Sequence, residues 1–218
     1  MNAALPQMQD RYGVVGVSFR STAIRDALAP QNFFYNAVER RPDGDVPRQI
    51  TCLVDICFAG EDRDRILAQM SAPEVNLISL TITEKGYCHK NGQLDASHPD
   101  ILHDIDNPTV PVSAPGFIVA ALARRRAAGI APFTCLSCDN LANNGRLLAR
   151  IIGGLAGLTD PELAAWIQAK VCFPVTMVDR IVPATTDNDR DDVAKLVGQK
   201  DQAPVIHEPF WQWVIEDN

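Results

Sequence analysis

The sequence predicts an α/β fold built around a mainly parallel sheet, and two observations lead to this prediction. Strand-like apolar runs alternate along the chain with segments of helical periodicity, which is typical of α/β proteins. The clearest unit begins with Phe133-Thr-Cys-Leu-Ser-Cys-Asp-Asn140, where an apolar run ends in small and polar residues. Because ligands bind at the carboxyl ends of strands in open α/β sheets, Asp139 and Asn140 are candidate functional residues.

A helix is predicted directly after this strand and loop. The apolar residues that recur at the spacing of one helical face are Leu147, Leu148, Ile151, Ile152 and Leu155. Either Asn143 or Asn144 is suited to cap the helix, because asparagine is a preferred N-cap residue. The chain therefore reads strand, loop, helix at this point.

Composition limits the classes of function. The chain has 218 residues, of which 46% are hydrophobic, enough for one large domain or two small ones. Its net charge of −7 argues against nucleic acid as a partner. No apolar run approaches the ~18 residues that a membrane span needs, and the first residues do not form a signal peptide. We therefore expect a cytoplasmic protein without a membrane partner.

The six cysteines do not form the framework of a small disulfide-rich protein, because the chain is too long for that class. Cys135 and Cys138 have CxxC spacing, but a structural zinc site needs two further ligands at comparable spacing. The four histidines are scattered. We expect no metal site, and we interpret Cys135 and Cys138 as small buried residues at a strand end.

In the first third of the chain, the pattern predicts a strand over 12–19 and a short helix from Ser21 to Leu28. A β-hairpin is predicted from Phe33 to Phe58, turning at Pro42-Asp-Gly-Asp45. A surface helix follows over 61–70. Its predicted inward-facing residues are Ile66, Leu67 and Met70.

A buried strand is predicted over 76–84, followed by the polar cluster Glu84-Lys-Gly-Tyr-Cys88. Residues 89–115 hold four prolines and few apolar residues, and they are predicted to form a long loop, either covering a site or tolerated as an insertion. Residues 115–128 are predicted to form a helix. Its basic run Arg124-Arg-Arg126 is interpreted as a solvated face.

Asp160 and Pro161 are predicted to start a further helix. The next predicted strand spans 173–183 and carries Asp179 and Arg180 inside an apolar run, where they either form a salt bridge or contact a ligand. The tail is the most aromatic part of the chain and is expected to pack against something. Its large aromatic residues are Phe210, Trp211 and Trp213.

Four segments resemble, in the same order, the mannitol dehydrogenase family of long-chain polyol and sugar-acid dehydrogenases. They are Ser79-Leu-Thr-Ile-Thr-Glu-Lys-Gly-Tyr-Cys88, Ser137-Cys-Asp-Asn140 with Asn144-Gly145, Phe173-Pro-Val-Thr-Met-Val-Asp-Arg-Ile-Val-Pro183, and Glu208-Pro-Phe-Trp-Gln-Trp-Val-Ile-Glu-Asp217. The resemblance extends from about Tyr12 to the end of the chain. The sequences of the first and last segments are most similar to the fructuronate reductase (D-mannonate oxidoreductase) branch.

The resemblance implies a Rossmann-like domain, a mainly parallel sheet with helices on both faces, which binds NAD or NADP. It implies reversible hydride transfer between this cofactor and a polyol or sugar acid, either D-mannonate and D-fructuronate or mannitol and fructose. In this family a helical C-terminal domain follows and supplies a lysine as the general base.

The resemblance also implies roles for single residues. Asn140 helps to hold the reacting oxygen, which suits an uncharged amide donor beside a developing alkoxide. Glu84 lines the water route of the catalytic proton, and Asp179 lies on the substrate side, where we also place Arg180. The candidates for cofactor contact are Ser21, Thr83 and Asp139.

The sequence departs from the family at three places. Nothing in Met1–Asp10 resembles the first strand and its glycine-rich, phosphate-binding turn. The acid expected to bind the adenosine ribose is missing from Arg20-Ser-Thr-Ala23, and Asp26 is the first carboxylate. We expect these 218 residues to lack the catalytic C-terminal domain. Strands 12–19 and 77–84 would flank the missing first strand, which predicts a gap between them, a new pairing between them, or an edge filled by a partner.

Two readings remain open. In one, residues 1–218 are a single incomplete nucleotide-binding domain of a dehydrogenase, inactive alone and completed by a separate chain with the C-terminal domain. In the other, the chain is a non-catalytic binding or interaction module derived from this fold.

Overall fold

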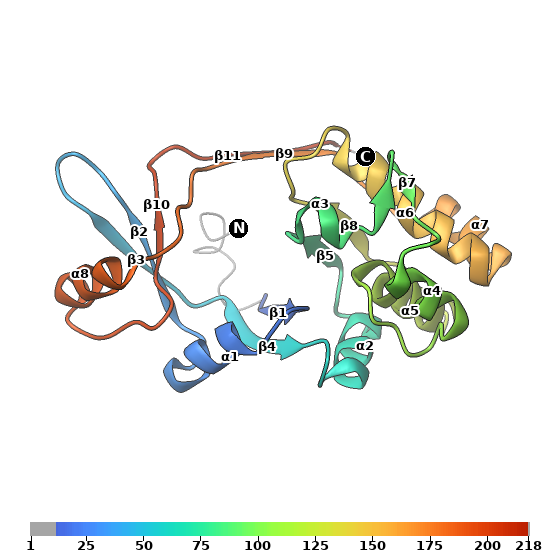
Figure 1. Ribbon diagram of the computed structural model, residues 1–218, viewed down its shortest axis with the longest axis horizontal. Helices are drawn as coiled ribbons and strands as arrows, with labels where there is room; N and C mark the ends of the chain where they lie inside the picture. Colours follow the sequence, from blue (N-terminus) through green and yellow to red (C-terminus); the bar gives the residue numbers. More distant parts are fainter. Residues whose placement is uncertain (1–11, 218) are drawn as a thin grey trace. The chain divides into compact units, whose positions relative to one another are not determined.

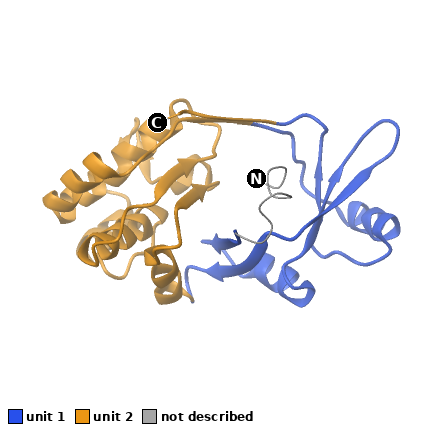
Figure 2. Ribbon diagram, turned by 180° about the vertical axis from the view of Figure 1, so that it is seen from behind, with its two compact units in different colours: residues 1–61, 179–211 blue, residues 62–178, 212–218 orange. Residues whose placement is uncertain are grey.

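The computed structural model describes residues 12–217 and divides the chain into two compact units (Figures 1 and 2). Each unit is formed from two stretches of sequence. The first comprises 1–61 and 179–211, and the second comprises 62–178 and 212–218. The predictions for Met1–Asp10, the missing first strand and glycine-rich turn, lie outside the described residues.

The first unit contains a parallel strand pair. β1 (Val14–Ser18) confirms the strand predicted over 12–19, and it pairs with β4 (Leu53–Phe58) so that Ser18 lies opposite Phe58. Both strands are rich in β-branched residues, which favour the extended backbone. α1 (Ala23–Leu28) and the 3₁₀ turn η2 (Ala29–Gln31) follow β1, and α1 contacts β4.

The predicted hairpin is confirmed over a shorter range. β2 (Tyr35–Glu39) and β3 (Val46–Ile50) pair in antiparallel register around the predicted turn. The prediction is wrong in extending the hairpin to Phe58, because the last stretch is β4 and pairs with β1. An alternating pattern identifies a strand, but the partner of that strand depends on residues far away in sequence.

The same hairpin gains a third strand from the end of the chain. β10 (Val205–His207) adds to β2 in parallel, and α8 (Asp187–Val197) packs against this sheet. Their shared core consists of Val38, Val193 and Ile206, with Val197 packed beside it. Residues distant in sequence therefore build this half of the first unit.

The second unit is built on another parallel pair, β5 (Leu77–Leu80) with β8 (Thr134–Ser137). Helices pack around it (Figure 1): α2 (Arg63–Ser71), α3 (Thr83–Gly86), α4 (Pro99–Asp106), α5 (Ala114–Ala127), α6 (Asn144–Thr159) and α7 (Pro161–Lys170). The predicted inward face of α2 is buried, and so are all five residues predicted on the apolar face of α6. Asp160 accepts backbone hydrogen bonds from Glu162 and Leu163, which confirms the predicted start of α7.

The prediction that residues 89–115 form a long loop is wrong. This stretch forms a small hairpin, β6 (His89–Lys90) with β7 (Gln93–Leu94), followed by helix α4. Pro99 occupies the start of α4, where proline is favoured, so it opens a helix here. The buried carboxylate of Asp104 then accepts backbone hydrogen bonds from Val112 and Ser113 and closes the segment.

Arg125 contradicts the prediction that the basic run of α5 is a solvated face. Its side chain is 1% exposed. Nη1 donates to the backbone carbonyls of Met70, Ala72 and Val75 at 3.1, 2.7 and 3.0 Å, and Nε donates to that of Ala131 at 2.7 Å. A buried guanidinium is tolerated when its donors are paired, so Arg125 ties α5 to the chain after α2.

The strand predicted over 173–183 is shorter than expected. β9 (Thr176–Asp179) pairs with β11 (Gln212–Ile215) from the aromatic tail. Trp213 is half-buried on β11, whereas Phe210 and Trp211 stay exposed by 53% and 58%, contrary to the expectation that the tail aromatics pack. Among the described residues, no helix combines the length and the apolar character needed to cross a membrane.

Candidate functional site at the carboxyl ends of the strands

Asp139 connects the carboxyl ends of β5 and β8. Its carboxylate accepts hydrogen bonds from the backbone N–H of Ile82 and of Thr83, each at 3.0 Å. It also accepts the hydroxyl of Tyr87 at 2.7 Å. We refer to residues 81–84 and 138–145, which follow these two strands, as the β5–β8 end. Asp139 acts as its clamp, because both carboxylate oxygens are engaged.

Tyr87 continues the network into the protein interior. Its side chain is fully buried, and its hydroxyl lies 2.5 Å from the hydroxyl of Ser137. Burial, with the Asp139 carboxylate adding to it, raises the pKa of Tyr87 well above the ordinary value of a phenol. Tyr87 is therefore a neutral hydrogen-bond donor that holds Asp139 in place.

Asn144 is the second anchor of the β5–β8 end. Its buried Nδ2 lies 3.1 and 3.0 Å from the carbonyl oxygens of Ser137 and Asp139. Its Oδ1 accepts the backbone N–H of Gly145 and of Thr176 at 2.8 and 2.9 Å. Thr176 in turn donates its hydroxyl to the Ser137 carbonyl at 2.5 Å. This one side chain therefore joins β8, α6 and β9.

The two predicted caps of α6 have different roles. Asn143 occupies the N-cap position in a left-handed conformation, with φ of 51°, but its side chain makes no capping hydrogen bond. Asn144 bonds inward instead. Gly145 follows it because a Cβ there would lie 2.3 Å from the carbonyl oxygen of Pro174, a distance that no side chain permits.

Asn140 lies directly after the clamp and is exposed. Thr83 and Glu84 are exposed too, but the prediction that they end a strand is wrong, since they begin α3. Thr83 has a φ of 63°, an uncommon conformation for a β-branched residue, and its N–H is one of the two that Asp139 accepts. Glu84 Oε1 lies 3.7 Å from His89 Nε2. The network therefore supports three exposed polar side chains.

Asp179 and Arg180 are exposed at the end of β9. Within residues 12–217 they form no ion pair with each other, and Arg180 Nε donates to the Phe210 carbonyl at 3.2 Å. β9, which ends at Asp179, pairs with β11 and not with β8. Asn140 belongs to the second unit and Asp179 to the first.

Ser21 lies after β1 in the first unit. We refer to residues 19–26 and 59–61 as the β1–β4 end. Ser21 is exposed, and its carbonyl accepts the Ser18 hydroxyl at 2.8 Å. The Ser18 carbonyl accepts the N–H of Ala59 at 2.9 Å. The turn is thus closed by one hydrogen bond from the Ser18 side chain and one between backbone groups, while Arg20 and Ser21 are exposed.

Each of the two strand ends, taken by itself, exposes polar side chains of a kind that a nicotinamide dinucleotide can bind. Such a cofactor presents sugar hydroxyls, an amide and phosphates, which need hydroxyl, amide and cationic partners. The β1–β4 end offers Arg20 and Ser21, and the β5–β8 end offers Thr83 and Asn140, all exposed. The carboxylate of Asp139 carries three hydrogen bonds from the protein. We therefore assign it first to holding the two strand ends.

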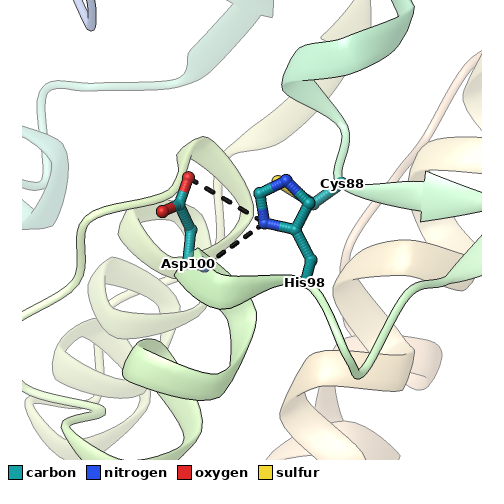
Figure 3. Close-up of side chains that lie close together, drawn as sticks. All are labelled: Cys88, His98 and Asp100. Carbon is teal, nitrogen blue, oxygen red and sulfur yellow. Dashed lines mark hydrogen bonds and ion pairs between the residues drawn. The ribbon is translucent and has the colours of Figure 1, made fainter.

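One group of potential metal ligands occurs in the described part of the chain: Cys88, His98 and Asp100 (Figure 3). His98 Nδ1 accepts the backbone N–H of Asp100 at 3.2 Å and caps α4. Burial raises the pKa of the Cys88 thiol to about 11, so it stays protonated at neutral pH. We assign His98 and Asp100 to the start of α4. Cys135 is buried, as predicted for it, and Cys138 is half-buried.

Comparison with known proteins places the chain in a family. A family model of the mannitol dehydrogenase Rossmann domain matches residues 3–218. A mannitol 2-dehydrogenase from Cereibacter sphaeroides is 43% identical over 210 residues, covering 95% of this chain and 44% of that protein. A mannitol 2-dehydrogenase from Aspergillus terreus is 41% identical over 212 residues, covering 94% of this chain and 42% of that protein.

Two solved structures are similar to this one. The ternary complex of Pseudomonas fluorescens mannitol 2-dehydrogenase with NAD and D-mannitol has a TM-score of 0.90 at 40% identity, covering 95% of this chain and 43% of that one. A substrate-free D-sorbitol dehydrogenase has a TM-score of 0.93 at 34% identity, covering 98% and 46%. The chain thus spans a little under half the length of these relatives. The predicted Rossmann-like α/β fold is confirmed, and the chain belongs to the mannitol dehydrogenase family.

Proposed function

We propose that residues 1–218 form the nucleotide-binding part, as one domain, of an NAD(P)-dependent polyol dehydrogenase. The observation that carries this proposal is the 40% identity, over 95% of the chain, with an enzyme whose complex holds NAD and D-mannitol. The β5–β8 end supports it, because a bonded scaffold there holds polar side chains open to a ligand. Ser21 and Thr83 contribute hydroxyl groups to the cofactor.

Asn140 holds the reacting oxygen of the substrate. A bound nicotinamide cofactor supplies the acceptor or donor for the hydride. The amide of Asn140 donates a hydrogen bond to the oxygen as negative charge develops on it, and it does not compete for the proton because it is neutral. The carbonyl of the preceding Asp139 is held by Asn144, so the backbone that carries Asn140 is fixed before the substrate binds.

Glu84 lies on the route by which the catalytic proton leaves, and Asp179 binds the substrate. The carboxylate of Glu84 is 69% exposed beside His89, which suits a group that exchanges protons with water. Asp179 accepts hydrogen bonds from substrate hydroxyls. The general base is a lysine supplied by a second part of the enzyme, in the same polypeptide or in a separate chain, so residues 1–218 alone are inactive. We expect the enzyme in the cytoplasm.

One candidate pair of substrate and product is the polyol mannitol and the ketose fructose. A second candidate pair, which Arg180 favours, is the sugar acids D-mannonate and D-fructuronate. Its guanidinium is exposed, and the one hydrogen bond that we observe engages Nε alone. A free guanidinium edge suits the carboxylate of a sugar acid.

The test combines binding with turnover. The purified chain is titrated with nicotinamide nucleotides, then assayed with mannitol, D-mannonate and D-fructuronate, alone and joined to the C-terminal half of a relative. We expect nucleotide binding by the chain and turnover only in the joined protein. Binding without turnover in the joined protein would support a non-catalytic module instead. Turnover by the chain alone would contradict the assignment of the base to the second part.

A further inference from the structure

The β1–β4 end lacks the group that usually selects NAD. In Rossmann folds an acidic residue in this region binds the adenosine ribose hydroxyls of NAD, and an arginine accommodates the 2′-phosphate of NADP. By its place in the chain, β1 is the second strand of such a fold. The residues that follow it, Phe19-Arg-Ser-Thr-Ala-Ile-Arg25, include no carboxylate.

The nearest carboxylates of the β1–β4 end are already engaged. Asp26 lies within α1, where it accepts the Thr22 hydroxyl at 2.6 Å through one oxygen and lies 3.5 Å from Arg25 Nε through the other. Glu61 accepts Arg25 Nη2 at 3.0 Å. A ribose hydroxyl would have to compete with these partners for an acceptor.

Arg20 and Ser21 present the opposite chemistry. Both are exposed, and Arg20 has no hydrogen bond or ion pair with another residue within 12–217. The hydrogen bond from Ser18 to the Ser21 carbonyl holds the turn that carries them. The turn therefore offers a cationic side chain and a hydroxyl at adjacent positions, in a segment, 19–25, that contains no carboxylate.

We propose that Arg20 and Ser21 form a subsite for the 2′-phosphate of NADP(H), and that the enzyme prefers NADP(H) to NAD(H). The inference rests on the proposed function and specifies its cofactor. A phosphomonoester carries roughly 1.5 to 2 negative charges at neutral pH and accepts strong hydrogen bonds. A guanidinium is the side chain best suited to a phosphate, and the serine hydroxyl adds a donor.

The test is a calorimetric titration of the chain, and of the chain joined to a second half, with NADPH and NADH. We expect NADPH to bind roughly 10-fold more tightly or better, since a hydrogen bond to a charged group contributes about 1.5–3 kcal/mol. Arg20→Ala should remove most of this preference by weakening NADPH alone. Ser21→Glu should reverse it, because its carboxylate repels the phosphate and accepts ribose hydroxyls.

Arg48→Ala is the matched control, since Arg48 is an exposed arginine of the same unit, on β3. It should leave the ratio of the two affinities unchanged. Tighter binding of NADH, or an Arg20→Ala protein with the wild-type ratio, would overturn the inference and leave the proposed function standing. Failure of both nucleotides to bind would overturn the proposed function itself.

Discussion

The two parallel strand pairs end in different kinds of polar structure. At the β5–β8 end, Asp139 and Asn144 bond to the backbone around them, and Tyr87 braces Asp139 from the interior. At the β1–β4 end, Arg20 and Ser21 expose their side chains to solvent. A buried network is costly to break, whereas exposed side chains are replaced with little effect on stability. Under the proposed function, the β5–β8 end positions reacting groups and the β1–β4 end selects a ligand.

Asn144→Ala should have the largest effect on the free energy of unfolding. The substitution takes the Asn144 acceptor away from the N–H groups of Gly145 and Thr176 in a buried place and removes a donor from the Ser137 and Asp139 carbonyls. We expect a loss of about 3–4 kcal/mol in unfolding free energy. Urea unfolding of the purified chain measures it. Asn140→Ala, an exposed neighbour, is the control and should change the same quantity by less than about 0.5 kcal/mol. Equal losses in both variants would show that the β5–β8 end is not a bonded scaffold.

Asn140→Ala should act on catalysis instead of stability. In the active enzyme, loss of a donor to the developing oxyanion should lower kcat by ~10²–10³-fold. Cofactor affinity should be preserved. Steady-state kinetics with a polyol substrate, together with nucleotide titration, separate the two quantities. If the Asn140→Ala enzyme had the kcat of the wild type, Asn140 would not be a catalytic residue.

Tyr87→Phe should have an intermediate effect that depends on pH. At neutral pH it removes the hydrogen bonds to Ser137 and Asp139, and we expect a loss of about 1–2 kcal/mol. Because burial raises the pKa of Tyr87 in the folded state, the folded protein keeps this proton above pH ~10, where the unfolded chain releases it. The wild type therefore loses stability there through a group that the variant lacks.

The difference between wild type and Tyr87→Phe should accordingly narrow as pH rises above ~10. Denaturant unfolding of both proteins across this range measures it. A difference that stays constant would mean that the Tyr87 phenol ionises alike in the folded and unfolded states.

Arg20→Ala and Ser21→Ala should have the smallest effect on stability. Neither side chain is buried, so each should change the unfolding free energy by less than about 0.5 kcal/mol. Thermal and denaturant unfolding of the two variants would show this. A loss comparable to that of Tyr87→Phe would mean that the β1–β4 end is also a bonded scaffold, and the contrast between the two ends would disappear.

Only the exposed part of the candidate site was indicated by the sequence. Asn140 became a candidate because polar residues follow an apolar strand, and the structure places it, exposed, three residues after the end of β8. The supporting roles of Tyr87 and Asn144 were missed. Both lie in the quoted motifs, but their partners Ser137 and Thr176 are 50 and 32 residues away, so no local pattern indicates the bonds.

The sequence by itself determined features that depend on neighbours along the chain. The apolar face of α6, the Asp160 start of α7 and the turn of the β2–β3 hairpin all follow from local spacing or capping. The ordered motifs also determined the Rossmann-like fold and the family. Their common physical basis is that periodicity, caps and turns act within a few residues.

Only the tertiary structure decided which distant groups meet. β4, which the sequence placed in the hairpin, pairs with β1 instead, and α4 forms within the stretch that was predicted to be a loop. Arg125 is buried because the backbone carbonyls of Met70, Ala72 and Val75, 50 to 55 residues away, accept hydrogen bonds from its guanidinium. Burial of a polar or charged side chain is favourable only where partners are already in place, and the fold supplies those partners.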